Sequence, residues 1–122
     1  MIWDTPEGAT IQWTAMGEGV VDWKSYVARW QQLCPTVPFQ IETISGFAKP
    51  FPYKSDAFWE NYDKRPEAIA RFAAIAKRGR EIAPFKAPEG TDRKTAQREY
   101  QKAELERSLR YCRETLGLGL KS

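Results

Sequence analysis

The chain has 122 residues, a net charge of +3, 42% hydrophobic residues and 13% aromatic residues. This composition excludes a disordered chain, and the length predicts one domain of ordinary size. The sequence contains no histidine, which excludes Ser–His and Cys–His triads and removes the commonest transition-metal ligand. Any chemistry performed by this chain alone would therefore use carboxylates, lysine, tyrosine or cysteine.

The sequence gives no sign of a membrane segment. No run of apolar residues reaches the length of a membrane span, and the start "MIWDTPEG" lacks the charged and apolar regions of a signal peptide, so we expect a cytosolic protein. The two cysteines, Cys34 and Cys112, lie far apart on predicted helices. In a reducing compartment we expect both to be buried apolar groups without a disulfide.

The charge is distributed unevenly along the chain. Residues 1–76 carry 7 basic and 9 acidic side chains, whereas residues 77–122 carry 12 basic and 7 acidic ones. A basic half can attract nucleic acid or an acidic partner. Here the basic residues alternate with glutamates in a helical pattern, which is typical of a solvated face with ion pairs, so nucleic acid is not the favoured partner.

The first 44 residues predict a strand, a helix and a second strand. "TIQWTA", Thr10–Ala15, is rich in β-branched and aromatic residues and precedes a glycine-rich turn. Asp22 is a suitable N-cap for an amphipathic helix over Trp23–Cys34 that ends before Pro35. "FQIETI", Phe39–Ile44, predicts the second strand. This order indicates a right-handed βαβ unit with parallel strands.

The middle of the chain predicts a long loop followed by a helix. The loop is rich in proline and aromatic residues and contains a short helix that Ser55 would cap. An amphipathic helix over residues 65–80 follows, with Pro66 in its first turn and Gly79 near its end. A proline-rich linker then leads to the last element.

That last element is a long helix over about Arg93–Leu116, capped by Thr91 or Asp92. Its apolar residues lie on two nearly opposite faces, so we expect it to contact different parts of an assembly along its length. One face carries Ala96, Tyr100 and Ala103, and the other carries Leu105, Leu109, Cys112 and Leu116.

Two parallel strands alone do not make a stable sheet, because both of their edges stay open. We therefore expect the chain to be part of a larger α/β barrel or sheet, or an obligate partner in one. The alternative is a small α+β domain in which "MIWDTP" supplies a further strand.

The segment "MGEGVVDWKSYVARWQQLCPTVPFQIETISG" resembles the closing segment of the sugar phosphate isomerase/epimerase superfamily, the xylose isomerase-like TIM barrels. That family shows a G-x-G-x-x-D-W turn, a helix, and a strand that ends in glutamate. The matching residues here are Gly17, Gly19, Asp22 and Trp23, followed by Glu42 after the helix.

The resemblance implies an α/β fold: a partial TIM barrel made of its last two βα units, with a helical C-terminal extension. Residues 1–47 would be the closing βαβ segment, and residues 48–122 would pack on the barrel as the extension. Glu42 would lie at the barrel mouth as a ligand of a divalent metal (Mn, Mg or Zn) and as a catalytic acid/base group. The metal would polarise the carbonyl of a sugar substrate.

The other metal ligands of that family are absent from this sequence. One carboxylate cannot hold a divalent ion that prefers about six oxygens, so we expect this chain alone to be inactive and to bind no metal tightly. The missing part of the barrel, or a homo-oligomeric partner, would complete the site.

Two alternatives stay open. Glu42 could be a structural hydrogen-bond or ion-pair partner, or a plain surface residue. The whole chain could be a non-catalytic α/β interaction module that binds a partner through its long basic C-terminal helix. For Gly17 and Gly19, a tight turn between strand and helix is favoured over a phosphate-binding loop, which would open directly onto a helix.

Overall fold

A computed structural model describes residues 1–119. Its sheet has three strands in the order β1-β2-β3, with β1 at Ile2–Thr5, β2 at Gly8–Gln12 and β3 at Ala48–Phe51. Both pairings are antiparallel, and their registers place Ile2 opposite Ile11 and Gln12 opposite Ala48. The sheet is therefore a hairpin to which a distant third strand adds.

The predicted partial TIM barrel with parallel strands is wrong, because every strand pair in this sheet is antiparallel. The segment "MIWDTP" forms β1 and turns back within two residues to pair with β2, a local pairing with a small loop-closure cost. The predicted strand Thr10–Ala15 overlaps β2, but the strand ends at Gln12. The alternative of a small α+β sheet with a strand from the N-terminal segment matches this arrangement.

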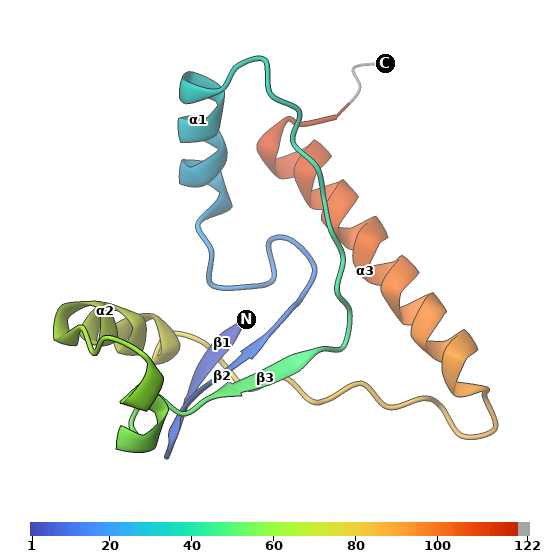
Figure 1. Ribbon diagram of the computed structural model, residues 1–122. Helices are drawn as coiled ribbons and strands as arrows, with labels where there is room; N and C mark the ends of the chain where they lie inside the picture. The colour runs from blue at the N-terminus through green and yellow to red at the C-terminus, as the bar shows by residue number, and fades with distance from the viewer. Residues whose placement is uncertain (120–122) are drawn as a thin grey trace.

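The predicted strand Phe39–Ile44 joins no sheet within residues 1–119. The segment nevertheless shows the alternation of a strand: Phe39, Ile41 and Thr43 are partly buried, and the residues between them are exposed. Figure 1 shows this segment running beside α3 (Arg93–Leu116) toward β3. The sequence pattern thus predicted the alternating burial of this segment, but the predicted pairing of the segment with another strand was wrong.

The predicted helices are confirmed, and local capping explains where they begin. Helix α1 spans Trp23–Leu33, and a carboxylate oxygen of Asp22 accepts a hydrogen bond from the Ser25 N–H at 3.1 Å. Asp92 caps α3 in the same way, accepting from the Thr95 N–H at 2.9 Å.

The two remaining helices lie between β3 and the linker. Helix α2 spans Pro66–Ala76 and carries its proline in the first turn, as predicted. The predicted short helix is a 3₁₀-helix, η1, at Asp56–Asn61. Ser55 precedes η1, but its side chain makes no capping hydrogen bond.

The small core lies between the sheet and α2. Its buried members are Ile2, Ala9, Tyr53 and Ala76. Just after α2, Gly79 approaches β1 so closely that a Cβ atom would overlap the carbonyl oxygen of Ile2. Only glycine fits there, and this close approach fixes α2 on the sheet.

Helix α3 contacts different neighbours along its length, although not through the whole of the two apolar faces that its pattern predicted. Near its start Tyr100 packs on Phe85, with ring centroids 4.7 Å apart. Further along, Ser108 contacts the loop that follows β2, accepting a hydrogen bond from the Met16 N–H at 2.9 Å. Two large apolar residues on this helix, Leu105 and Leu109, remain exposed.

The described fold is open: α2 packs on the small sheet, whereas α1 and α3 contact each other and not the strands (Figure 1). The chain exposes 9492 Å² of surface, whereas a compact monomer of its mass, 14.1 kDa, exposes about 6,700 Å². The excess, about 2,800 Å², is larger than the about 800 Å² that one partner buries in a standard protein interface. Several large apolar residues, Trp13, Leu33 and Leu109 among them, are part of this exposed surface.

Candidate functional site

A cavity of about 530 Å³ lies between the end of β2 and the segment 39–44. The pairing of β2 with β3 continues one step past the strands, where the Trp13 N–H donates to the Phe47 carbonyl oxygen at 3.2 Å. Beyond that bond, residues 13–16 and 39–44 line the same cavity from different parts of the chain. The cavity thus begins where the sheet ends.

Four aromatic residues, Trp13, Trp23, Phe39 and Phe72, contribute to the cavity wall. Trp13 packs edge-on against Phe47, with ring centroids 5.0 Å apart, and Trp23 packs against Phe39 at 6.3 Å. Trp13 is still 39% exposed. A wall of this kind favours an occupant with substantial apolar surface.

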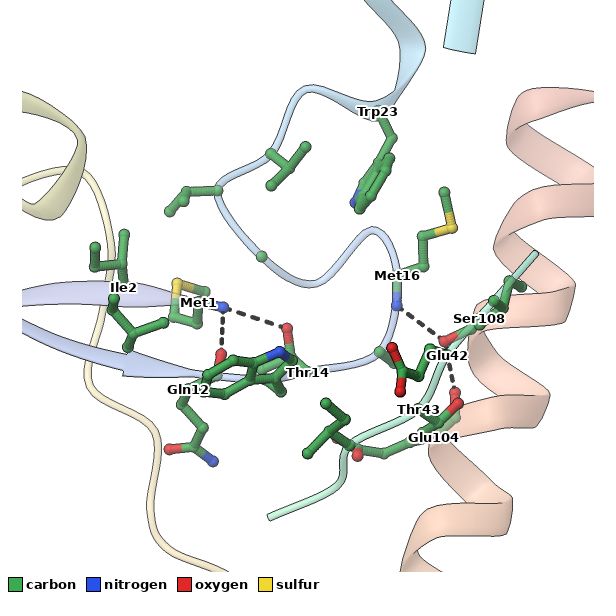
Figure 2. Close-up of a pocket in the computed structure, with 18 of the residues that line it drawn as sticks. Met1, Ile2, Gln12, Thr14, Met16, Trp23, Glu42, Thr43, Glu104 and Ser108 are labelled. Atoms are coloured by element: carbon green, nitrogen blue, oxygen red, sulfur yellow. Dashed lines mark hydrogen bonds between the residues drawn. The ribbon is translucent and has the colours of Figure 1, made fainter. Parts of the chain in front are cut away.

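Helix α3 supplies polar groups on the opposite side (Figure 2). The Ser108 hydroxyl accepts from the Met16 N–H and donates to the Glu104 carbonyl oxygen at 2.8 Å. One turn further along, the Cys112 sulfur lies 3.3 Å from the Met16 sulfur, and burial raises the pKa of the Cys112 thiol. These contacts fix α3 against the loop after β2.

Glu104 places a carboxylate at the cavity although only 2% of the residue is exposed. An oxygen of this carboxylate lies 3.8 Å from the Arg107 guanidinium, which also donates to Glu18 at 2.6 Å. Burial and the Glu104 carboxylate together raise the pKa of the Tyr100 hydroxyl. The Arg107 guanidinium offsets part of the negative charge of Glu104 on this side of the cavity.

Glu42, the residue that the resemblance identified, also lines this cavity (Figure 2). It is exposed, and it makes no side-chain hydrogen bond or ion pair with any other residue among 1–119. The fold brings Glu42 and Glu104 to one cavity from segments about sixty residues apart in sequence. Sequence reasoning did not identify Glu104 or Ser108. The only sequence signal for them was their spacing of four residues, which places both on one face of a helix whose buried side changes along its length.

The residues present do not fit the expected metal. In the described part of the chain, no three Asp, Glu, Cys or His side chains are placed to hold a metal ion. Two carboxylates would leave most positions around Mn²⁺ or Mg²⁺ to water or to another molecule, and Zn²⁺ needs about four ligands. No metal-dependent step is derived from this site.

The glycine-rich turn has a packing role. Gly17 has a φ of +91°, and a Cβ atom there would overlap the Tyr111 ring. This close contact with α3 explains the glycine without a bound phosphate. It supports the tight-turn interpretation.

No protein-family profile, no curated protein and no solved structure matches this chain. Within residues 1–119, no helix is both long and apolar enough to cross a membrane.

Proposed function

We propose that this chain is a non-catalytic interaction module that binds an extended segment of a partner polypeptide along its cavity. The excess of exposed surface, 9492 Å² against about 6,700 Å² for a compact monomer, carries this proposal. A chain that leaves so much apolar area in water gains free energy when another polypeptide covers it.

The unpaired segment 39–45 offers the partner a backbone edge. Among residues 1–119, no backbone N–H from Phe39 to Gly46 donates a hydrogen bond to protein. The Thr43 carbonyl oxygen accepts from the Gln101 side chain of α3 at 3.2 Å. Because the backbone groups of an extended strand alternate between its two edges, those of Glu42 and Ile44 face away from Gln101. A partner strand added on that edge would satisfy them.

The side chains around the cavity define the chemistry of that partner segment. The exposed apolar residues Val21 and Ile44, 50% and 41% exposed, lie at the cavity together with Trp13. Glu42 and Glu104 add negative charge. An extended segment rich in apolar residues, with a basic residue near Glu42, matches this surface in both polarity and charge.

Sedimentation velocity of the purified chain, combined with binding of the dye ANS, tests this proposal. We expect either concentration-dependent self-association or strong ANS fluorescence from a monomer, because both report uncovered apolar surface. The variant Ile44→Gln should reduce the response, and Glu114→Gln, an exposed change on α3 outside the cavity, should not. A compact monomer that binds no ANS would contradict the proposal.

A second candidate function keeps the substrate class of the sugar isomerase resemblance. Glu42, Glu104 and Thr43 line the cavity together with two tryptophans. Such groups can hydrogen-bond sugar hydroxyls and cover the apolar face of a sugar ring. Titration with monosaccharides, followed by tryptophan fluorescence, tests this candidate, and binding that is unchanged in Glu42→Gln would contradict it.

A further inference from the structure

A second cavity, of about 250 Å³, lies where η1 leads into α2. Its walls are largely aromatic: Phe51, Tyr53, Trp59 and Phe72 line it. The Tyr53 and Phe72 rings meet edge-on with centroids 5.4 Å apart, and the Trp59 indole N–H donates to the Tyr53 carbonyl oxygen at 2.8 Å. These contacts give the cavity a firm apolar wall.

The Tyr53 hydroxyl has no hydrogen-bond partner among residues 1–119, although the residue is only 5% exposed. Leaving a buried hydroxyl unpaired costs free energy, so such groups normally have a partner. Tyr53 lines the cavity, but its hydroxyl oxygen is enclosed by protein and does not reach the cavity surface.

Two charged side chains of opposite sign also line this cavity, Asp63 and Arg65. Neither forms an ion pair within the described part of the chain. Arg65 is the N-cap residue of α2 but makes no side-chain capping bond. The first hydrogen bond at this end of α2 runs from the Ile69 N–H to the Arg65 carbonyl oxygen at 3.0 Å. The N–H groups of Glu67 and Ala68 therefore remain free, and they favour an anion.

We propose that this cavity binds an aromatic α-amino acid as its zwitterion. The carboxylate would lie between Arg65 and the start of α2, and the ammonium would pair with Asp63. The aromatic side chain would pack on the ring wall. A cavity of about 150 Å³ already holds a benzene ring, so the volume here leaves room for the polar groups as well.

The choice of a zwitterion follows from the balance of charge. A simple carboxylate would face Asp63 and the Glu67 side chain in the first turn of α2. A simple amine would face Arg65 and the positive end of the helix. A ligand with both charges pairs each group with its opposite. This proposal does not depend on the proposed partner of the larger cavity.

NMR titration of the full chain with L-phenylalanine tests the proposal. We expect saturable shifts of the Trp59 indole N–H and of the Ala68 amide. Arg65→Ala and Asp63→Asn should each weaken binding by about tenfold or more, since each removes a charged hydrogen-bond partner. Arg71→Ala, an exposed change on α2 outside the cavity, should leave binding unchanged.

Two analogues separate the contributions of the ligand charges. Phenethylamine lacks the carboxylate and 3-phenylpropionate lacks the amine, so each should bind at least about tenfold more weakly than L-phenylalanine. Absence of saturable shifts, equal binding of either analogue, or equal loss in Arg65→Ala and Arg71→Ala would overturn the proposal. The charged residues tested are exposed, so these variants should keep their fold.

Discussion

Glu42 has a role in this account that differs from the one its sequence context implied. It lines a cavity and lacks a polar partner within residues 1–119, and it shares that cavity with Glu104 of α3 rather than with a set of metal ligands. A strand that ends in glutamate is visible in the sequence. The placement of Glu104 beside it depends on how α3 crosses the rest of the chain, which no local pattern determines.

Tyr53 permits a prediction about stability at the level of a single atom. Tyr53→Phe removes a buried hydroxyl that has no partner, so the unliganded chain should gain up to about 1 kcal/mol in free energy of unfolding. Urea denaturation measures this change. Tyr26→Phe, at a residue that is 55% exposed, should have almost no effect. A loss of about 1 kcal/mol or more in Tyr53→Phe would mean that the hydroxyl has a partner in solution.

The secondary-structure elements differ in how far the sequence could predict them. Helices α1 and α3 follow from caps and periodicity, because an N-cap bond such as Asp92 to Thr95 connects residues three positions apart. Strand β3 has no comparable local signal, since three of its four residues are exposed and Pro50 lies within it. Its partner in β2 lies some forty residues earlier in the sequence, so the pairing depends on long-range packing.

The start of α1 should respond to acid. Hydrogen bonds from Ser25 lower the pKa of Asp22 below its usual value of 3.8. A carboxyl whose pKa is lowered by folding stabilises the folded state above its unfolded pKa, and this contribution is lost as pH falls through the folded pKa. An NMR titration of the Asp22 carboxyl should therefore give a midpoint below 3.8.

The Ser25 contact provides the control for this titration. In Ser25→Ala the side-chain hydrogen bond, whose length is 2.7 Å, is removed, and the midpoint should rise toward the usual value. Ser55→Ala, before η1, should leave the Asp22 midpoint unchanged. A wild-type midpoint at or above 3.8 would show that Asp22 does not cap α1 in solution.

At the scale of the whole molecule, the need for a partner stays a prediction, and its physical basis differs between the sequence and the structure. Two parallel strands would have left both edges of the sheet open. The described sheet is antiparallel, and its first pair, β1 with β2, forms between strands that are neighbours in the sequence. The uncovered surface instead arises because α1 and α3 contact each other and leave the sheet, with its small core, to α2 alone (Figure 1). Composition and periodicity describe each element, but they do not determine how tightly the elements pack together.

The central claim is that another polypeptide covers the cavity along segment 39–45. Site-specific photo-crosslinking in the source cells, with the photoreactive residue at position 44, tests it most directly. The same residue at position 114, an exposed site on α3, provides the control, and a second copy of this chain counts as a partner. A second substitution in the crosslinking chain, Glu42→Pro, removes an N–H on the edge of segment 39–45 that faces away from α3. The matched substitution Thr43→Pro removes an N–H on the edge that faces α3.

We predict a discrete crosslinked polypeptide from position 44 but not from position 114, with a yield that Glu42→Pro lowers more than Thr43→Pro does. Equal crosslinking from both positions, or none from position 44 in cells where the chain is abundant and folded, would contradict the account.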